Sequence, residues 1–290
     1  MDPVIPHITD DVADTLFINI LMKCHEHRRK NGFYHDPMAC HLVESVDYDF
    51  TRFEKGKNSS VCIALRAKYF DEVVEAFIRA HPDPVVVFVG CGLDPRFHRL
   101  NPATAAKAVF YELDLPEVIA LREQLLPHAD NDRLLPGSML DTGWMDGLRR
   151  DHPESTFLFT MEGVCIYFEK AAVRRTMSAL AARFPGGKVL FDATSSWLCR
   201  NQERIIGSRI LKAPFRLALD DEREVETWAD NIRLESCRYY PDFRDFRHTG
   251  LVQNLMLRLV PQFKKSSRII ACELEGPAAR DAGGIPASGN

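Results

Sequence analysis

Two glycines and two acidic residues close two neighbouring apolar runs that have the character of buried strands. Residues 85–89 (VVVFV) lead directly into Gly90 and Gly92, and glycine at such a turn lets the backbone approach a ligand closely. Glu112 and Asp114 end the next apolar run, where an acidic side chain can bind the hydroxyls of a ribose. A plain strand-to-helix turn would also use the glycines, but the acids on the second strand favour a nucleoside ligand.

The next position of this glycine pattern limits the kind of nucleotide. A dinucleotide-binding turn has a further glycine three residues after Gly92, and Pro95 stands there instead. Proline blocks the close packing of helix on strand that glycine permits. The pattern therefore predicts a ligand without a pyrophosphate. It disfavours a nicotinamide-dependent oxidoreductase, for which the sequence also has no Tyr-x-x-x-Lys motif.

Arg66 stands within an apolar helical stripe. A helix is expected over residues 62–80, and Arg66 falls on its apolar face at 100° per residue. That face is formed by Cys62, Tyr69, Phe70, Val73 and Phe77. A buried guanidinium is costly unless an anion accompanies it. The alternatives are a ligand carboxylate held by two hydrogen bonds, a structural ion pair with a distant acid, and a side chain that reaches solvent.

The elements that would position these residues alternate along the chain. Helices are expected over residues 10–30, 36–43, 62–80, 117–126 and 169–184. Strands are expected over residues 85–89, 107–113, 133–140, 156–161 and 188–193. Strands that alternate with helices predict a parallel, doubly wound α/β sheet.

Several separate blocks of the sequence resemble those of the leucine carboxyl methyltransferase family. In chain order they are residues 32–37 (GFYHDP), 87–100 (VFVGCGLDPRFHRL), 111–119 (YELDLPEVI), 162–164 (EGV) with Tyr167, 184–187 (FPGG) and 191–192 (FD). The resemblance covers residues 10–195. Within the family, the sequence is most similar to the bacterial O-methyltransferases of polyketide biosynthesis, of the tetracenomycin type.

The resemblance implies a class I methyltransferase fold with S-adenosylmethionine as the methyl donor. By this resemblance, Arg66 binds the methionine carboxylate, which matches the expectation that it needs an anion. Gly90 and Gly92 line the methionine and the ribose. Asp114 binds the ribose, with Glu112 as the second choice.

The resemblance also places residues near the adenine and the methionine. Ser138 and Met139 correspond to a pair beside the adenine, and Glu162 corresponds to an acid near the methionine end. The family often has an aspartate at the position of Ser138, which meets the adenine amino group. Either Ser138 makes this contact here, or Asp141 does.

The implied fold is a Rossmann-like α/β fold with a mostly parallel seven-stranded sheet. Residues 1–84 would form a helical N-terminal cap of the same domain, and residues 85–274 the methyltransferase core. A helical lid insert is expected at about residues 197–248, and a flexible tail at residues 275–290. Residues 197–228 are expected to be largely helical with an interruption near Pro214, and residues 251–260 and 268–274 to form two closing strands.

The activity implied is transfer of a methyl group to a carboxylate or phenolic oxygen of a small molecule. A polyketide-like acceptor is expected by analogy alone. A carboxylate is already ionised at neutral pH, whereas a phenol would benefit from a general base. A protein C-terminal carboxylate is an alternative acceptor. A non-catalytic partner subunit with the methyltransferase fold is an alternative function.

The sequence indicates the acceptor-binding residues and a general base less clearly than the cofactor-binding residues. Candidates for an aromatic acceptor pocket are Tyr34, Trp197, Arg200, Tyr239, Tyr240 and Phe243, with packing inside the insert as the alternative. Candidate bases are His35, His41, His98 and His248, each with a structural role as the alternative. His25 and His27 lie two residues apart and so do not share a helix face. No metal is expected.

Composition excludes several other classes of protein. The 290 residues carry a net charge of -4, so no basic excess points to nucleic acid. The apolar runs are strand-sized, and neither a membrane partner nor a secretory signal is expected. The eight cysteines are scattered and are expected to be mostly buried and reduced. These features predict a cytoplasmic protein.

Overall fold

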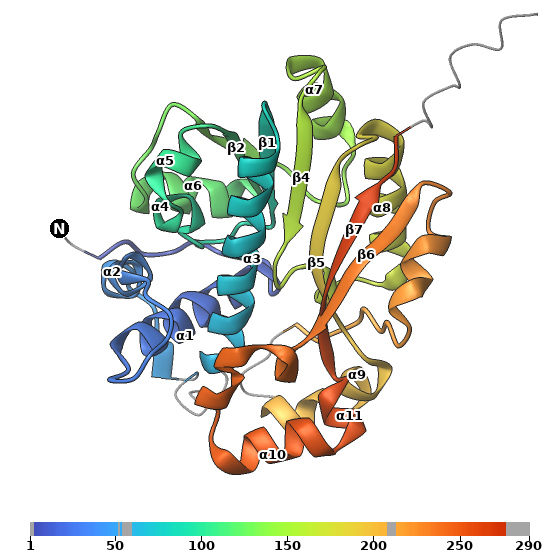
Figure 1. Ribbon diagram of the computed structural model, residues 1–290. Helices are drawn as coiled ribbons and strands as arrows, with labels where there is room; N and C mark the ends of the chain where they lie inside the picture. The colour runs from blue at the N-terminus through green and yellow to red at the C-terminus, as the bar shows by residue number, and fades with distance from the viewer. Residues whose placement is uncertain (1–2, 52, 54–59, 208–212, 277–290) are drawn as a thin grey trace, which may run out of the picture.

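The computed structural model describes residues 3–51, 53, 60–207 and 213–276, which surround a central sheet (Figure 1). The described strands are β1 (Pro84–Val89), β2 (Val109–Asp114), β3 (Asp132–Pro136), β4 (Thr156–Met161), β5 (Lys188–Thr194), β6 (Ile232–Tyr239) and β7 (Ser267–Leu274). They form one seven-stranded sheet in the order β3-β2-β1-β4-β5-β7-β6. The first five of this order run parallel, and β7 is antiparallel to both neighbours. The predicted mostly parallel seven-stranded sheet is therefore confirmed.

The residues of β1 show why helices cover both faces of this sheet. Every residue of the strand is buried. Val85, Val87 and Val89 pack into one apolar cluster, and Val86 and Phe88 pack into another. Side chains alternate along a strand, so these two clusters lie on opposite faces. The continuous apolar run thus reflects a strand buried on both sides.

The helices form a layer on each face and a cap at one end. In chain order, the described α-helices are α1 (Leu16–Arg28), α2 (Pro37–Ser45), α3 (Ser60–Ala80), α4 (Arg96–Arg99), α5 (Pro102–Ala105), α6 (Pro116–Leu125), α7 (Gly143–Asp151), α8 (Lys170–Arg183), α9 (Ser196–Gln202), α10 (Leu251–Leu259) and α11 (Pro261–Lys264). α7 and α8 pack on one face of the sheet, and α3, α5 and α6 pack on the other (Figure 1). α1 and α2 pack against α6.

The C-terminal third departs from the prediction. Residues 251–260, expected to be a strand, form helix α10 instead, and the strand beside β7 is β6. β6 lies within the range predicted as a helical insert (197–248). Helical segments lie at both ends of residues 197–228, in α9, the π-helix Glu203–Gly207 and the 3-10 helix Glu222–Thr227, and the predicted interruption near Pro214 is confirmed by irregular backbone over residues 213–221. The closing strand at 268–274 is confirmed as β7. Most of the predicted tail lies outside the described residues.

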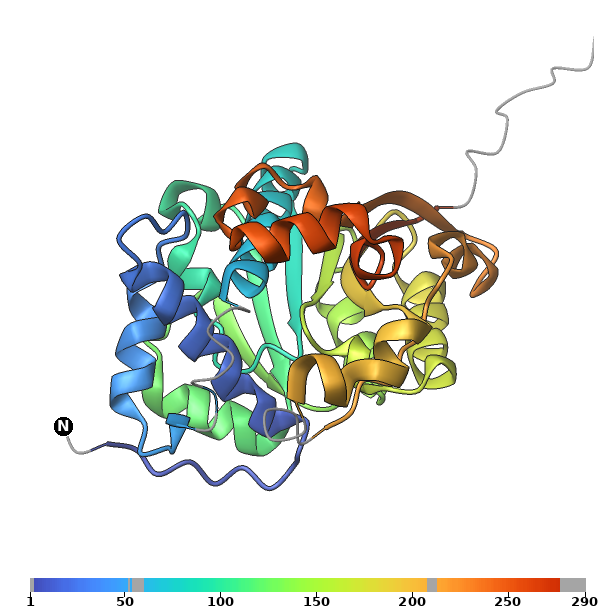
Figure 2. The same cartoon turned by 90° about the horizontal axis from the view of Figure 1, so that it is seen from below.

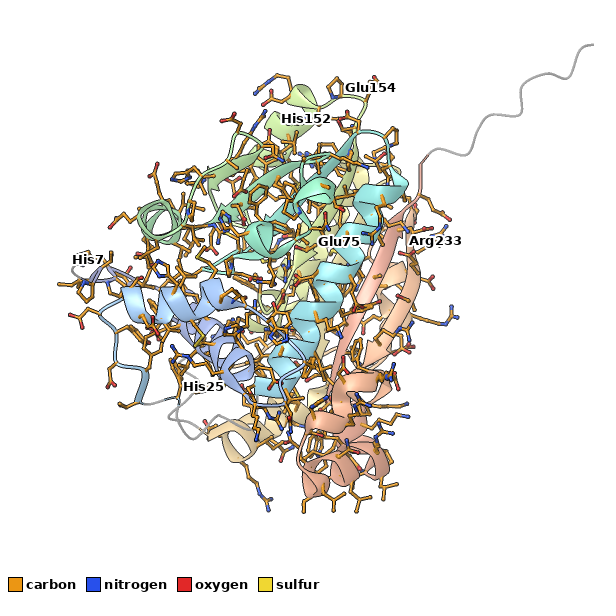
Figure 3. All side chains as sticks on the ribbon, turned by 60° about the vertical axis from the view of Figure 1, so that its left-hand side comes forward. His7, His25, Glu75, His152, Glu154 and Arg233 are labelled. Atoms are coloured by element: carbon orange, nitrogen blue, oxygen red, sulfur yellow. A yellow bond between two sulfur atoms is a disulfide. The ribbon has the colours of Figure 1, made fainter. Side chains whose placement is uncertain are left out.

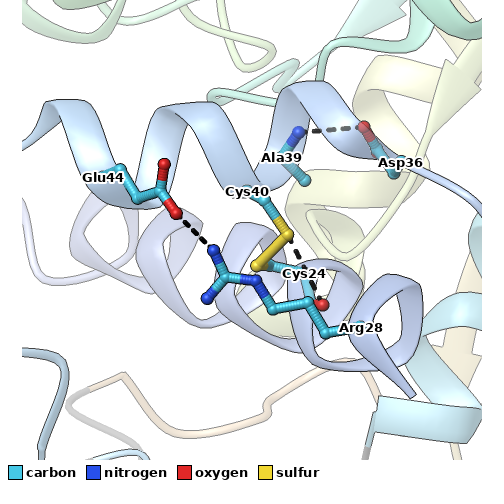
Figure 4. The surroundings of a disulfide bond; sticks show 6 residues. All are labelled: Cys24, Arg28, Asp36, Ala39, Cys40 and Glu44. Carbon is cyan, nitrogen blue, oxygen red and sulfur yellow. Dashed lines mark hydrogen bonds and ion pairs between the residues drawn. A yellow bond between two sulfur atoms is a disulfide. The ribbon is translucent and has the colours of Figure 1, made fainter. Parts of the chain in front are cut away.

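A disulfide joins Cys24 of α1 to Cys40 of α2, contrary to the expectation that the cysteines are reduced (Figure 4). The two Cα atoms lie 4.7 Å apart because α1 and α2 pack side by side. An ion pair between Arg28 and Glu44 links the same two helices. The spacing of the two cysteines in the sequence gave no sign of this contact. The argument from reduced cysteines for a cytoplasmic location therefore fails for this pair.

Candidate functional site

A cavity of about 290 Å³ lies at the carboxyl ends of β1, β2 and β4. Six residues predicted from the sequence are in its wall: Gly90, Gly92, Asp114, Ser138, Met139 and Glu162. They meet because parallel strands of one sheet end at the same edge. α1 contributes Asn19 and Lys23 to the wall from the N-terminal part of the chain.

The turn after β1 is shaped by positive φ angles and by a link to β2. Gly90 has a φ of 67° and Gly92 a φ of 53°, which glycine adopts without strain. Asp114 accepts hydrogen bonds from the amides of Gly92 and Leu115, each at 2.7 Å. Burial raises the pKa of Asp114, and these two hydrogen bonds counteract the rise. Asp114 therefore holds the turn and keeps further lone pairs for a ligand in the cavity.

Buried charges of both signs line another part of the cavity. Lys23 Nζ lies 2.9 Å from Asp94 Oδ1, and Arg96 pairs with Glu162. Burial raises the pKa of Glu162, but Lys23, Arg96 and Arg66 outweigh it and lower that pKa to about 2. Burial also raises the pKa of Asp94, and the surrounding cations bring it well below its usual range. Both acids are therefore anionic at neutral pH.

Arg66 lies next to this cluster but is not part of the cavity wall. Its Nη1 lies 2.8 Å from Asp192 Oδ2, its Nε lies 3.1 Å from Glu162 Oε1, and its Nη2 donates to Asn19 Oδ1 at 3.1 Å. A Cβ added to Gly163 would lie 2.9 Å from Nη2, so the guanidinium sits directly behind that glycine. Of the alternatives raised by the sequence, these contacts match a structural ion pair with distant acids.

Glu112 and Asp141 also lie outside the cavity wall, and their contacts with a ligand remain predictions. Glu112 Oε1 pairs with Arg122 Nη2 at 2.5 Å, and burial raises the pKa of Glu112 to about 8. Arg122 Nη1 donates to the carbonyl oxygens of Gly92 at 3.0 Å and Asp94 at 2.9 Å. Asp141 is exposed and accepts a hydrogen bond from the amide of Gly143 at 3.0 Å.

A model of the leucine carboxyl methyltransferase family matches residues 18–181, which include the glycine turn, Asp114 and Glu162. The chain belongs to this family. S-adenosylmethionine is therefore its cofactor, and the chain is a methyltransferase by family.

Individual relatives agree with the family match. TcmP, the tetracenomycin polyketide synthesis O-methyltransferase of Streptomyces glaucescens, is 27% identical over 89% of this chain and 95% of its own length. A Mycobacterium ulcerans protein assigned as an S-adenosyl-L-methionine-dependent methyltransferase is 29% identical over 73% of this chain and 76% of its own. A Thermobifida fusca structure assigned as a methyltransferase covers 95% of this chain and 96% of its own, with a TM-score of 0.56 at 12% identity. That likeness supports the fold alone.

The cavity fits the cofactor of the leucine carboxyl methyltransferase family. Gly90 and Gly92 leave room for a ligand against the backbone, and Asp114 provides an acceptor for ribose hydroxyls. Met139 and Leu140 provide apolar surface beside Ser138. Lys23 and Arg96 are the cations of the wall that a methionine carboxylate would meet. No group of three His, Cys, Asp or Glu residues that could hold a metal ion occurs in the described part of the chain.

Gly90→Ala is expected to cost more stability and more S-adenosylhomocysteine affinity than the matched change Gly186→Ala. Both glycines have positive φ, 67° and 84°, so either alanine costs about 1–2 kcal/mol in backbone strain. At Gly90 the added Cβ would also lie 2.3 Å from Val164 Cγ2, whereas at Gly186 nothing lies within 4 Å. Urea unfolding and calorimetric titration measure the two effects, and equal losses in both variants would contradict the role of this contact.

The aromatic residues predicted for the acceptor do not line this cavity. Tyr34 is buried against α3 with Arg99 over its ring. Trp197 packs edge-on against Phe263 at 4.8 Å, and Tyr239 donates to Glu222 at 3.2 Å. Arg200 is exposed, and Tyr240 and Phe243 pack with residues of α3. These contacts match the alternative that the residues pack the structure around them.

None of the candidate histidine bases is in the cavity wall. This holds for His35, His41, His98 and His248. The other histidines are dispersed as well: Figure 3 shows His152 near the top of the molecule and His25 far below it, on the side of α1. His152 meets the hydroxyl of Tyr111 at 2.9 Å.

Sequence reasoning missed seven polar residues of the cavity wall, namely Asp10, Thr15, Asn19, Lys23, Asp94, Arg96 and Thr160. Asn19 and Lys23 stand four residues apart in α1 and so share one face of a helix that is otherwise mostly buried and apolar. Lys23 is only 1% exposed. A lysine and an asparagine on a buried helix face are the signal that could have revealed these two.

Proposed function

We propose that this methyltransferase transfers the methyl group to a carboxylate oxygen of a small molecule. The observation that carries the proposal is the chemistry of the cavity wall. Its ionisable side chains are Asp10, Lys23, Cys91, Asp94, Arg96, Asp114 and Glu162. Burial raises the pKa of the Cys91 thiol well above its usual range, so it is protonated at neutral pH. Glu162 and Asp94 have lowered pKa values and are too weakly basic to deprotonate a phenol, whose pKa is about 10. A carboxylate acceptor needs no base.

In the proposed mechanism the protein binds, aligns and excludes water. When bound, S-adenosylmethionine supplies a methyl group on a positively charged sulfur, which a carboxylate oxygen can attack in line. Asp114 would hold the ribose, and Ser138 and Met139 the adenine. Lys23 and Arg96 would bind the methionine carboxylate, with Glu162 fixing their positions. Alignment of the two reacting atoms in a dry cavity supplies the rate enhancement.

The similarity to TcmP supports a polyketide-like aromatic acid as the acceptor. TcmP is aligned with this chain over nearly its whole length, at 27% identity. The cofactor would fill most of the cavity. The acceptor would enter beside Phe168 and Val12, two apolar residues of the cavity wall. The partner in this proposal is the small-molecule acceptor, and no nucleic acid is proposed as a partner.

The test has two arms. Isothermal titration with S-adenosylhomocysteine should show binding, and NAD should show none. Transfer of labelled methyl groups should then be measured to 2-naphthoic acid, to 2-naphthol and to a peptide with a C-terminal leucine. The expected product is an ester of the naphthoic acid, which alkali cleaves, formed at a rate that changes little between neutral and mildly alkaline pH.

Other outcomes would count against the proposal. An alkali-stable ether of naphthol, formed faster as the pH rises, would indicate a phenol acceptor with a base. Methylation of the peptide alone would indicate a protein substrate. Binding of S-adenosylhomocysteine without transfer to any acceptor in a wide screen would favour the non-catalytic subunit. A protein that does not bind S-adenosylhomocysteine would contradict the proposed function as a whole.

A further inference from the structure

Helix α10 carries a row of large aliphatic side chains on its outer side. The row is formed by Leu251, Val252, Leu255, Met256 and Leu259, which are between 42% and 86% exposed. Their spacing of four residues places them on one face of the helix. The inner side is held by Leu257, which packs with Phe246, and by Asn254, which donates to the Phe246 carbonyl at 3.0 Å. We call these five exposed residues the α10 ridge.

Basic side chains surround the α10 ridge. The sequence has no Asp or Glu between residues 246 and 272, although the whole chain has a net charge of -4. Exposed cations in this segment are Arg247, Arg258, Lys264 and Lys265. α9, α10 and α11 lie together at one end of the molecule (Figures 1 and 2), and α9 adds the exposed Arg200. The segment that carries the α10 ridge is thus positively charged; of the two acids in the 3-10 helices that pack against α10, Asp245 is paired with Lys68 and Asp242 is exposed.

We propose that the α10 ridge binds the surface of an anionic lipid bilayer. A helix with an aliphatic face and flanking cations lies in the bilayer interface, with its apolar side among the acyl chains and its cations at the headgroups. Such a helix does not cross the membrane, and none of the described helices is long and apolar enough to do so. The proposal concerns a surface away from the cofactor cavity and does not rest on the reaction.

The chemistry of the α10 ridge favours lipid over a protein partner. Contacts that dominate protein interfaces are mostly Trp, Tyr and Arg, whereas Leu and Val are under-represented. The ridge consists of Leu, Val and Met. A second copy of the chain would bring like charges such as Arg258 and Lys264 together around the paired ridges. A lipid surface instead supplies both an apolar phase and the opposite charge.

Sedimentation with vesicles tests the proposal on the full chain. The protein should bind vesicles of phosphatidylcholine mixed with phosphatidylglycerol, and not vesicles of phosphatidylcholine alone, and salt should weaken the binding. The double variant Leu255→Ser/Leu259→Ser should lose affinity by about tenfold or more. Ile5→Ser is the matched control, because Ile5 is 63% exposed outside this surface, and it should bind like the wild type.

A second pair of variants tests the charges. Lys264→Glu/Lys265→Glu should weaken binding to the anionic vesicles, and Arg150→Glu, an exposed cation of α7, should not. Unchanged S-adenosylhomocysteine titration of all variants shows that the fold is intact. The proposal is overturned if the anionic vesicles do not bind the protein, or if the ridge variant binds them as well as Ile5→Ser. It is also overturned if light scattering shows a dimer that the ridge variant converts to monomer.

Discussion

Glu162→Ala is expected to abolish measurable binding of S-adenosylhomocysteine and to lower the free energy of unfolding by about 3–5 kcal/mol. The Glu162 carboxylate pairs with Arg96, lies 3.1 Å from Arg66 Nε and lies 4.0 Å from Lys23 Nζ. All of these side chains are buried. Removing the carboxylate leaves this buried cluster one negative charge short in the wall of the cofactor cavity, because Asp94 and Asp192 are then shared among the same three cations. Calorimetric titration and urea unfolding measure both effects.

Glu169→Ala is the control for this prediction. The Glu169 side chain is 69% exposed, and its ion pair with Arg216 has an N–O distance of 3.5 Å, so we expect a change of less than about 1 kcal/mol. A Glu162→Ala variant that is as stable as Glu169→Ala would show that the cluster does not depend on this carboxylate.

The pH dependence of the same variant provides an independent check. The pKa of Glu162 is about 2 in the folded protein, against an ordinary value of 4.5. Its ionised form therefore stabilises the fold above pH 4.5, and this contribution is lost as the pH falls towards 2. Stability over that window should fall less steeply in Glu162→Ala than in the wild type.

Arg122→Met is expected to weaken S-adenosylhomocysteine binding by about tenfold and to lower the free energy of unfolding by about 3–5 kcal/mol. Arg122 pairs with the buried Glu112 and donates to the carbonyl oxygens of Gly92 and Asp94. The variant leaves a buried carboxyl group without its partner and two carbonyls without a donor, each of which costs about 1–3 kcal/mol. The glycine turn also loses the contact that fixes its orientation.

A double variant separates the two roles of Arg122. In Arg122→Met/Glu112→Gln the side chain at position 112 cannot ionise, so the stability that Arg122→Met loses through the unpaired Glu112 carboxylate above about pH 8 should return. The carbonyls of Gly92 and Asp94 still lack their donor, so the affinity should stay low. If affinity returned together with stability, Arg122 would matter only for the fold and not for the orientation of the turn.

The parallel part of the sheet could be predicted because β1, β4 and β5 are continuous apolar runs. The C-terminal part could not, for two physical reasons. β6 lies at the edge of the sheet, and its apolar residues Ile232 and Leu234 alternate with polar ones. Such a short alternation predicts a strand only weakly. In α10 the apolar residues face outward, so a stretch of Leu and Val suggested a strand although its spacing of four residues is helical.

The site residues could be predicted where a single strand and the turn that follows it fix their position. Gly90, Gly92 and Asp114 sit at strand ends, and their place in the cavity follows from the sheet. The partners of Arg66 could not be predicted, because Glu162 and Asp192 approach it from 96 and 126 residues away. Lys23 was missed for a similar reason: its role depends on how α1 packs across the ends of the strands.

The position of β7 constrains the order in which the protein folds. β7 lies between β5 and β6, although it follows both in the chain. β6 therefore has no neighbour in the sheet until β7 has paired, for example through Leu190 with Ala271 and Cys237 with Ile270. Pairing over such long separations is slow. A refolding chain should pass through a partial sheet with β5 as an open edge, and that exposed edge makes the intermediate prone to aggregate.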